Sequence, residues 1–472
     1  MANNCQVPTP RKYVVHMLNF IGYKENLVGK CVLENSCGEG NILIEIVKRY
    51  IEDAQKNNTE NEQISKGLER DIAAFETDKK KLDICVNKLN LLIHKYGLPG
   101  VKWNIRNEDF LKQPKEKYDY IIGNPPYITY HDMDSEKREY LKAEFISCKE
   151  GRFDYSYAFI EASIKSLDSN GKLAYLLPYS IIKNKFANKL REYMNPYITR
   201  IYDYTGIKIF PDAITSSVVL LMENKENKNY VQYCGVADKQ KRKINRANLS
   251  GRWNFAEENG RGKRRFGDYF DICNSVATLL NEAFIINNYE ETEKFYCADG
   301  EMIEKQIVYP AISMKSYNKK QKSKGKDTLI IFPYKVLDGE IEHFSDVEFR
   351  KKFPNTVKYF KKFRSKLENR NSDKNALWFE YGRSQAIGRV FGEKLVIPMV
   401  ITNDVSVCNA AFNAIPYAGY FIKCVHGSKM TLNEAKEVLE SKEFYSYVKA
   451  YGTPTTPTSY RISVNDIKEY RF

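Results

Sequence analysis

Residues 32–40 read VLENSCGEG, a short apolar run that leads into a turn of small residues. Val32 and Leu33 favour a buried strand, and the glycines at 38 and 40 allow backbone conformations that other residues disfavour. The residues from Gly40 to about Ile51 then follow the apolar spacing of an amphipathic helix. Any strand-to-helix turn favours glycine. In the first such unit of a doubly wound α/β sheet, however, the turn lies where nucleotide-like ligands bind.

The same alternation of strands and helices continues through the first half of the chain, which predicts an α/β, doubly wound, Rossmann-like domain. The residues from Glu52 to Arg70 are almost wholly polar, so we expect a surface helix or loop there. Strands are predicted at 30–34, 71–76, 102–106, 118–123, 172–177, 200–204 and 217–223, and helices at 40–51, 79–95, 155–167 and 181–194.

A second polar stretch, ENKENKNY at residues 223–230, suggests a division into two domains. Residues 1–228 form the α/β domain, and residues 229–472 are expected to form a mixed α+β domain of short strands and loops. The first part has 34 basic and 31 acidic side chains, and the second has 40 and 29. A basic domain beside a nearly neutral one is expected when one catalyses and the other binds a polyanion. A merely lysine-rich composition is the alternative.

The cysteine, histidine and hydropathy patterns limit the classes of protein. Ten cysteines are scattered without a Cys-x-x-Cys pair, and no signal peptide is recognisable, so we expect a reducing, cytoplasmic location. Five dispersed histidines form no ligand pattern, so no metal is expected. The longest uncharged run, residues 405–422, is too polar and too broken to span a membrane.

Acidic side chains follow two further strands of the predicted sheet. Glu76 ends the second strand, where a carboxylate can accept hydrogen bonds from ribose hydroxyls. Asp109 and Phe110 follow the third, where a carboxylate can bind an adenine amino group and a phenyl ring can stack on the base. An acid after a strand is more often a helix cap. The glycine turn, Glu76 and the pair Asp109-Phe110, however, follow three successive predicted strands. Together they predict a pocket for an adenosine-bearing cofactor.

The most specific signal is Asn124-Pro125-Pro126-Tyr127, directly after the strand 118–123. Two prolines restrict φ and remove two N–H donors, which leaves carbonyl oxygens free to accept hydrogen bonds. The amide oxygen of Asn124 and the carbonyl of Pro125 are therefore suited to hold an exocyclic NH2 group. Tyr127 is suited to stack on the attached ring. An ordinary proline turn is the alternative.

These motifs, in this order, resemble the gamma-class adenine-N6 DNA methyltransferases of bacterial restriction-modification systems. The resemblance covers residues 8 to about 222, and it implies S-adenosyl-L-methionine as cofactor and a C-terminal target-recognition domain. By the same resemblance, Thr9 helps to bind the methionine carboxylate, and Phe210 packs on the flipped base together with Tyr127. The cofactor-binding residues that it implies are Thr9, Glu34, Gly38, Gly40, Glu76, Asp109 and Phe110.

The sequence departs from the family pattern at the glycine turn. Asn35-Ser36 stands where Pro-Ala is commoner, and Glu39 stands where Thr is common, so details of methionine binding are expected to differ. The implied reaction is direct methyl transfer to N6 of an adenine that has been flipped out of double-stranded DNA. Asn124, Pro125, Pro126 and Tyr127 are its catalytic residues. No cysteine nucleophile is needed, so Cys37 is expected to be a packing residue.

The basic half offers candidate DNA contacts. The stretch 358–367 places Tyr359, Phe363 and Leu367 near one helical stripe and Lys361, Lys362 and Arg364 on the rest, as in a docked helix that faces phosphates. A solvated surface helix is equally compatible. Arg383 and Gln385 lie in a predicted loop, and these side chains suit guanine and adenine edges, respectively.

Double-stranded DNA and a companion restriction endonuclease are therefore the expected partners, and the chain itself shows no nuclease motif. Two other functions stay open. A protein glutamine methyltransferase also uses an Asn-Pro-Pro-Tyr motif, although a basic domain of this size argues against it. A non-catalytic DNA-binding specificity subunit does not need that motif.

Overall fold

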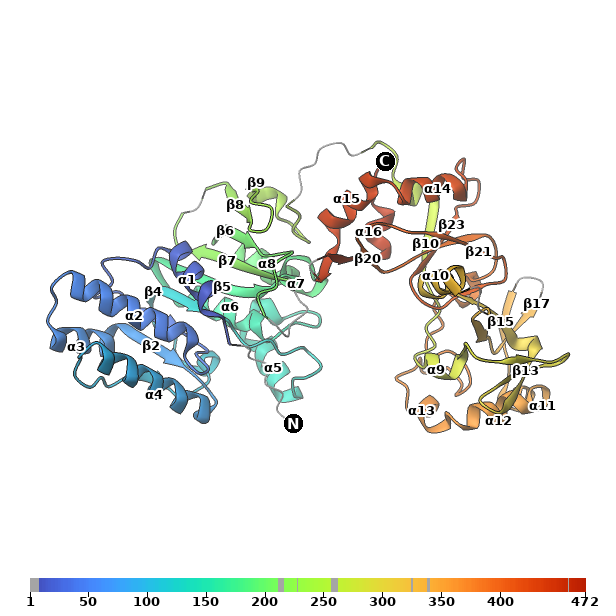
Figure 1. Cartoon of the computed structure of the whole chain (residues 1–472), viewed down its shortest axis with the longest axis horizontal. Helices are drawn as coiled ribbons and strands as arrows, with labels where there is room; N and C mark the ends of the chain where they lie inside the picture. Colours follow the sequence, from blue (N-terminus) through green and yellow to red (C-terminus); the bar gives the residue numbers. More distant parts are fainter. Residues whose placement is uncertain are drawn as a thin grey trace. The chain divides into compact units, whose positions relative to one another are not determined.

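The computed structural model describes residues 8–210, 216–226, 228–255, 262–323, 326–337, 340–456 and 458–472. The chain divides into two compact units (Figure 1). Unit 1 comprises residues 1–256 and 453–458, and unit 2 comprises residues 257–452 and 459–472. Among the described residues, no helix has both the length and the apolar character needed to cross a membrane.

Unit 1 contains a nine-stranded sheet in the order β3-β2-β1-β4-β5-β7-β6-β8-β9. The strands from β3 to β5 in this order are mutually parallel, whereas β7 runs antiparallel to both β5 and β6. Parallel order places the carboxyl ends of β1, β2, β3 and β4 at one edge of the sheet. The strands are β1 (Val32–Glu34), β2 (Ile72–Phe75), β3 (Asn104–Arg106), β4 (Tyr118–Gly123), β5 (Leu167–Pro178), β6 (Ile198–Asp203), β7 (Ser217–Glu223), β8 (Tyr230–Gly235) and β9 (Lys241–Asn245).

Helices cover both faces of this sheet, and a separate apolar cluster fills each side. One cluster joins the sheet to the helices that precede β4, and the other joins it to the helices that follow. The first set is α1 (Arg11–Ile21), α2 (Asn41–Lys56), α3 (Asn61–Asp71) and α4 (Lys79–Lys95); the second is α5 (Ser135–Glu144), α6 (Ser156–Lys165), α7 (Ser180–Lys183) and α8 (Asn188–Met194).

The predicted α/β alternation is confirmed, and three predicted elements, β4, β7 and α4, have the predicted bounds. The single helix predicted at 181–194 is wrong, because the chain forms α7 and α8 with a break at Asn184. The Asn184 side chain accepts a hydrogen bond from the Phe186 backbone, which competes with helical pairing. Buried Arg191 donates to the carbonyls of Ile181 and Asn184 and so satisfies groups at the break.

The polar stretch 52–70 is mostly helical, which is one of the two predicted alternatives, but one face of its second helix is buried. The second helix continues to Lys56, and α3 follows from Asn61. Ile64 and Leu68 are fully buried within α3 because their four-residue spacing places them on one face. Two apolar residues at that spacing are therefore enough to attach an otherwise polar helix to the core.

The predicted domain boundary at 228/229 falls between two strands of the sheet. Strand β8 pairs in parallel with β6, and β9 pairs with β8, so unit 1 continues past this hairpin. Residues 229–256 carry six basic and one acidic side chain. Residues 1–256 thus contain 40 basic and 32 acidic side chains, and residues 257–472 contain 34 and 28. The excess positive charge is therefore shared between the units.

Unit 2 is a mixed α+β structure built from small sheets. Its central sheet has the order β10-β23-β19-β21, and a second has the order β11-β16-β15-β22. Its remaining strands form the β12-β13-β14 sheet and the pairs β17-β18 and β20-β25. The strands are β10 (Phe270–Asn274), β11 (Ile285–Ile286), β12 (Glu290–Glu291), β13 (Phe295–Ala298), β14 (Glu301–Glu304), β15 (Val308–Ile312), β16 (Leu329–Ile331), β17 (Tyr334–Leu337), β18 (Glu340–His343), β19 (Lys394–Ile397), β20 (Val400–Thr402), β21 (Cys408–Ala410), β22 (Ile415–Pro416), β23 (Tyr420–Cys424) and β25 (Ser459–Arg461).

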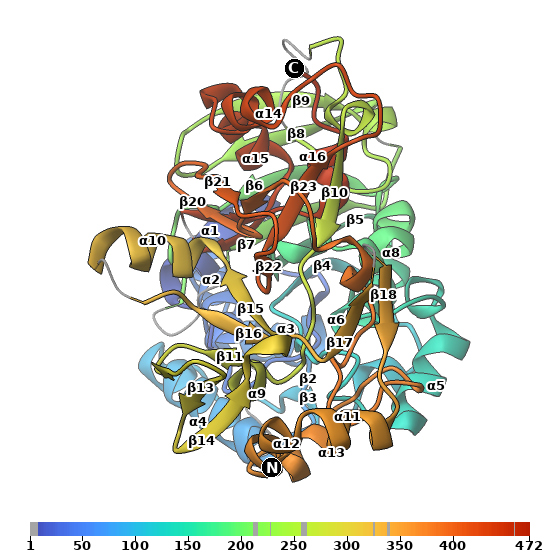
Figure 2. The same cartoon turned by 90° about the vertical axis from the view of Figure 1, so that its right-hand side faces the viewer.

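Six of the described helices of unit 2 form two groups (Figures 1 and 2), with α11–α13 in one and α14–α16 in the other, and α9 and α10 lie outside both. The stretch 358–367, predicted as one helix, is divided between α12 and α13 because the chain turns at Lys362 and Phe363. The helices are α9 (Asn281–Phe284), α10 (Met314–Ser323), α11 (Asp346–Lys352), α12 (Pro354–Lys361), α13 (Arg364–Glu368), α14 (Leu432–Leu439), α15 (Lys442–Tyr451) and α16 (Val464–Lys468); β24 (Thr453–Thr456) belongs to unit 1.

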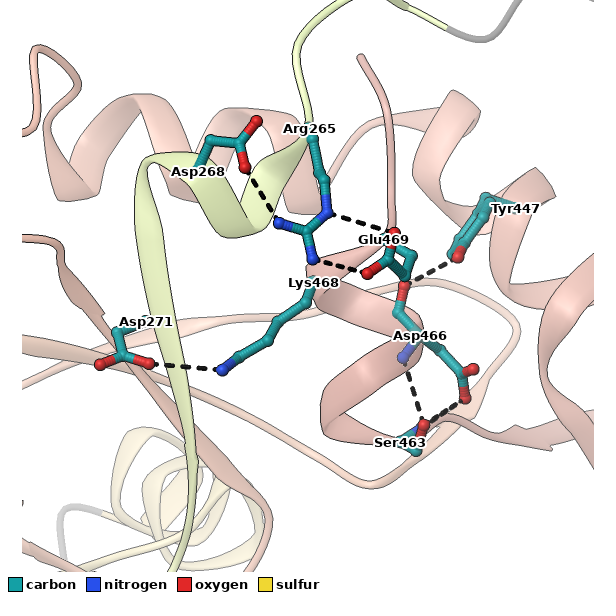
Figure 3. Close-up of polar contacts among 8 residues, drawn as sticks. All are labelled: Arg265, Asp268, Asp271, Tyr447, Ser463, Asp466, Lys468 and Glu469. Atoms are coloured by element: carbon teal, nitrogen blue, oxygen red, sulfur yellow. Dashed lines mark hydrogen bonds and ion pairs between the residues drawn. The ribbon is translucent and has the colours of Figure 1, made fainter. Parts of the chain in front are cut away.

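The beginning and end of unit 2 are joined by backbone pairing and by ion pairs (Figure 3). Arg265 binds both carboxylate oxygens of Glu469, at 2.6 and 3.1 Å, and its guanidinium also contacts Asp268 at 2.9 Å. Lys468 of α16 lies 3.5 Å from Asp271 of β10. These contacts hold the last helix against the first strand of the unit.

Candidate active site

The turn between β1 and α2 requires glycine at two positions. Gly38 and Gly40 have φ values of 54° and 86°. A Cβ atom on Gly40 would lie 2.6 Å from Cys85 Sγ, so close packing against α4 also excludes a side chain. The Gly40 amide donates to the Cys37 carbonyl at 2.8 Å. The turn is therefore tight for reasons of both conformation and space.

We expect Gly40→Ala to destabilise unit 1 by about 2–4 kcal/mol. The free-energy cost of the left-handed conformation and the cost of the clash with Cys85 add to each other. Gly29→Ala is a matched control, since Gly29 has φ 84° but a Cβ atom there would meet no heavy atom within 4 Å. It should cost only about 1–2 kcal/mol. Denaturant unfolding of the two variants measures the difference. An equal decrease in the free energy of unfolding of the two variants would show that the contact with Cys85 does not restrict the turn.

A cavity of about 170 Å³ lies beside this turn, and residues from several elements line it. Glu34 is 1% exposed, and its Oε2 atom has no hydrogen-bond partner among the residues that the structure describes. Burial raises the pKa of Glu34 well above its usual value, and the neighbouring Cys85 and Glu76 add to the effect. The lining residues are Pro8, Thr9, Glu34, Ser36, Cys37, Gly38, Glu39, Asn41, Ile42, Lys81 and Asn124.

Cys37 also lines the cavity, as a small packed residue. A hydrogen bond to Cys85 and burial raise the pKa of the Cys37 thiol, so the thiol stays protonated near neutral pH. Neither effect favours a thiolate nucleophile. Among the described residues, no group of three or more His, Cys, Asp or Glu side chains is arranged to hold a metal ion.

Glu76, expected to bind ribose, has both carboxylate oxygens in backbone hydrogen bonds. Its Oε2 accepts from the Gly38 amide and its Oε1 from the Asp78 amide, each at 2.8 Å. The side chain thus connects the end of β2 to the glycine turn. It is 5% exposed and is not among the residues that line the cavity.

Asp109 and Phe110, expected to hold adenine, lie at the end of β3 and outside the lining of that cavity. Asp109 accepts from the Leu111 amide at 3.0 Å and so caps a short 3-10 turn. Its other oxygen accepts from the Tyr155 hydroxyl at 3.3 Å. The Phe110 ring is 3% exposed and packs 5.4 Å from the Phe75 ring centroid. In this conformation Asp109 caps the turn and Phe110 packs in the core, so both side chains make contacts within the protein.

The Asn124–Tyr127 loop follows β4, and hydrogen bonds connect it to neighbouring parts of the unit. Asn124 Nδ2 donates to Thr9 Oγ1 at 3.2 Å, and Asn124 Oδ1 accepts from the Tyr127 hydroxyl at 2.6 Å. That hydroxyl also lies 2.5 Å from the Leu176 carbonyl, and Ser36 Oγ donates to the Asn124 carbonyl at 3.3 Å. Pro125 is buried and Pro126 half-buried. Thr9 and Asn124 are thus brought together at the cavity, as expected for one site.

A second cavity, of about 210 Å³, lies beside Tyr127. Asn124 lines the first cavity and Tyr127 lines the second, so the loop passes between them. The second cavity is largely aromatic and polar. Its lining residues are Tyr127, Thr129, Tyr130, Arg152, Phe153, Asp154, Ser156, Tyr157, Pro178, Ser180, Ile181 and Asn184.

Phe210, expected to stack on the base together with Tyr127, is 9% exposed and belongs to the apolar cluster of α1–α4. Tyr127 packs against the cluster on the other face of the sheet. The structure therefore does not bring these two rings into one described pocket. The chain directly after Phe210, from 211 to 215, lies outside the described residues.

The side chains expected to contact DNA are placed as follows. Lys361 is exposed on α12. Lys362 Nζ donates to the Asp299 carbonyl at 2.5 Å, and the Arg364 guanidinium lies 4.0 Å from the Trp378 ring centroid. Arg383 pairs with Asp373 at 2.9 Å, and Gln385 donates to the Ser275 carbonyl at 3.3 Å. Four of the five side chains therefore have partners within unit 2.

Comparison with known proteins follows the same division of the chain. Residues 18–210 match the family of Eco57I restriction-modification methylases. The Type II restriction enzyme and methyltransferase RM.Eco57I of Escherichia coli is 24% identical over 61% of this chain and 33% of that protein. The Type II methyltransferase M.AccI of Acinetobacter calcoaceticus is 28% identical over 37% of this chain and 31% of that protein. The chain thus spans about a third of these relatives.

Solved structures extend the similarity of the fold to both units. The Type IIL restriction-modification enzyme MmeI, solved in complex with DNA, matches with a TM-score of 0.62 and 14% identity, over 97% of this chain and 64% of that one. The Type ISP enzyme LlaGI matches with a TM-score of 0.55 and 12% identity, over 98% of this chain and 46% of that one. This likeness concerns the fold, whereas the sequence matches are to methyltransferases of restriction-modification type.

Proposed function

We propose that this chain transfers a methyl group from S-adenosyl-L-methionine to N6 of a flipped adenine in a specific double-stranded DNA sequence. We further propose that it is the modification component of a restriction-modification system. The observation that carries the proposal is the Asn124–Tyr127 loop, which has one cavity beside Asn124 and a second beside Tyr127.

The first cavity suits the amino-acid end of the cofactor. Glu34 offers a buried carboxylate oxygen without a partner, which suits a cationic amino group. Thr9 lines the same cavity, and its hydroxyl accepts a hydrogen bond from Asn124. When bound, S-adenosyl-L-methionine supplies a methyl group activated by its sulfonium. Glycines at 38 and 40 allow the backbone to approach such a ligand closely.

The loop suits an amine acceptor. Adenine N6 is a poor nucleophile because its lone pair is delocalised into the ring. Acceptance of both N6 hydrogens, by Asn124 Oδ1 and the Pro125 carbonyl, favours a pyramidal nitrogen whose lone pair points toward the methyl group. The hydrogen bonds with Thr9 and Tyr127 orient the Asn124 amide in advance. The Tyr127 ring lines the cavity proposed for the base, where stacking offsets the cost of flipping.

DNA is favoured over the other acceptors. The matched relatives are named as Type II methyltransferases, and the positively charged second unit suits a polyanion better than a glutamine side chain. A non-catalytic specificity subunit needs neither the loop nor a cavity with a buried carboxylate. A companion endonuclease is the proposed partner.

The deciding experiment supplies the purified chain with methyl-labelled S-adenosyl-L-methionine and mixed genomic duplexes, followed by digestion to nucleosides. We expect the label in N6-methyladenine. Label in N4-methylcytosine would show that the acceptor base is cytosine and not adenine. The proposed role of the loop would then still hold, because cytosine presents a similar amine. Label that enters only protein, or no transfer at all, would reject the proposal.

We expect cofactor binding to release a proton at Glu34. Burial raises the pKa of this carboxyl, so it is largely protonated below that pKa, whereas a cationic ligand stabilises the ionised form. The dissociation constant should therefore decrease as pH rises toward the pKa of Glu34 in the free protein, and level off above it. Calorimetry in buffers of different ionisation enthalpy measures the released proton. Glu34→Gln should abolish this dependence, and a constant affinity in the parent protein would contradict it.

A further inference from the structure

Three buried side chains, Asn35, Ser163 and Tyr175, form a ring of polar contacts beside the candidate site. The Tyr175 hydroxyl donates to Asn35 Oδ1 at 2.8 Å, and Asn35 Nδ2 donates to Ser163 Oγ at 2.8 Å. Ser163 Oγ lies 2.7 Å from the Tyr175 hydroxyl, and it also donates to the Phe159 carbonyl of the same helix at 2.6 Å. Each residue is at most 2% exposed. The ring connects the end of β1 with α6 and β5.

The ring lies directly against the residue that precedes Asn124. A Cβ atom on Gly123 would be 2.8 Å from Tyr175 Cε1 and 3.5 Å from Asn35 Oδ1. The residue after Asn35, Ser36, donates to the Asn124 carbonyl at 3.3 Å. Asn35 and Ser36 therefore connect the cofactor turn to the acceptor loop, the first through packing and the second through a hydrogen bond.

A purely structural role explains these residues less well. Polar groups buried without partners cost free energy, and an apolar core at this position needs none of the three. The hydrogen bonds that the three make with one another and with the Phe159 carbonyl instead restrict the orientation of each side chain. Asn35-Ser36 also stands where Pro-Ala is commoner in the family that the sequence resembles, and neither proline nor alanine supplies a side-chain hydrogen bond. The departure thus coincides with the contacts to the loop.

We propose that the Asn35–Ser163–Tyr175 ring and the Ser36 hydroxyl are positioning residues for methyl transfer. They hold the backbone at Gly123 and Asn124 at a set distance from the cofactor turn, so that the Asn124 amide meets the acceptor amine in line with the methyl group. A small displacement of reacting groups lowers the rate strongly, whereas it affects ground-state binding less. This inference rests on the proposed methyl transfer.

Tyr175→Phe tests the ring, because it removes the hydroxyl and keeps the aromatic contact with Gly123. We expect single-turnover methyl transfer to slow at least tenfold, with the cofactor dissociation constant and the KM for DNA changed less than threefold. Tyr50→Phe is the matched control. Tyr50 is fully buried in the same unit, and its hydroxyl donates to Asp71 at 2.6 Å, apart from the loop. It should lose comparable thermal stability while the transfer rate stays within twofold of the parent.

Ser36→Ala is the second test, and it decides the question if Tyr175→Phe does not fold. We expect a three- to tenfold slower transfer with cofactor affinity within threefold. A rate within twofold of the parent in a folded Tyr175→Phe, or in Ser36→Ala, would overturn the inference. So would equal slowing in Tyr175→Phe and Tyr50→Phe. If the parent protein itself transfers no methyl group, the proposed function fails instead, so the two failures are distinguishable.

Discussion

Asn124→Ala is expected to lower methyl transfer by about 10³-fold while cofactor affinity falls less than tenfold. Loss of one preorganised polar contact to the reacting group typically costs 10²–10³ in rate. Here the same change also removes the acceptor of the Tyr127 hydroxyl and the donor to Thr9, so the loop loses its orientation as well. The Glu34 side of the cavity is unchanged, which is why binding should persist.

Single-turnover transfer and equilibrium cofactor binding measure the two effects separately. Asn107→Ala is a suitable control, because Asn107 also follows a strand of the sheet but donates only to the Glu76 and Thr77 carbonyls among its described contacts. Its transfer rate should stay within about threefold of the parent. Substantial transfer by a folded Asn124→Ala variant would reject the proposed role of the loop.

The sequence predicted best those parts of the fold that local patterns determine. Strands β4 and β7 each contain an apolar run, at residues 120–122 and 218–222, and α4 begins at the Asp78 cap, so their bounds could be predicted. The break between α7 and α8 could not be predicted, because Arg191 and Asn184 look ordinary in a helical pattern. Membership of β8 and β9 in the first sheet depends on pairing with β6, which no local pattern reveals.

In the candidate site too, residues that belong to a local motif could be predicted, and residues that depend on distant contacts could not. Thr9, Glu34 and Asn124 were identified from motifs, and the structure brings them to one cavity. Ser163 and Tyr175 were missed, because they lie far from Asn35 in sequence and each is typical of a buried helix or strand. The unusual Asn35 was the one available signal. Asp109 shows the opposite case, in which a motif residue acts as a cap in this conformation.

The placement of β8 and β9 changes where DNA is expected to bind. Lys241 and Lys243 alternate with half-buried residues and share an exposed face of the edge strand β9. Lysine on an edge strand also prevents pairing with other chains, so the charge alone does not prove a DNA contact. The hairpin belongs to the unit that carries the proposed catalytic loop. If it contacts phosphates, unit 1 contributes to DNA affinity directly rather than through unit 2 alone.

Binding of duplex DNA is therefore expected to weaken by about 10³- to 10⁵-fold between 50 and 200 mM salt, as for proteins with six to ten phosphate contacts. Fluorescence anisotropy over a salt series with a mixed-sequence duplex gives the slope. The double variant Lys241→Ala and Lys243→Ala should reduce this slope by about 2, because each lost phosphate contact contributes about 0.9. Lys79→Ala, whose lysine already pairs with Asp83, is the control and should keep the parent slope. A flat salt response would leave the shared positive charge without a polyanionic partner, whereas a steep response unaffected by the β9 variant would assign the phosphate contacts elsewhere in the chain.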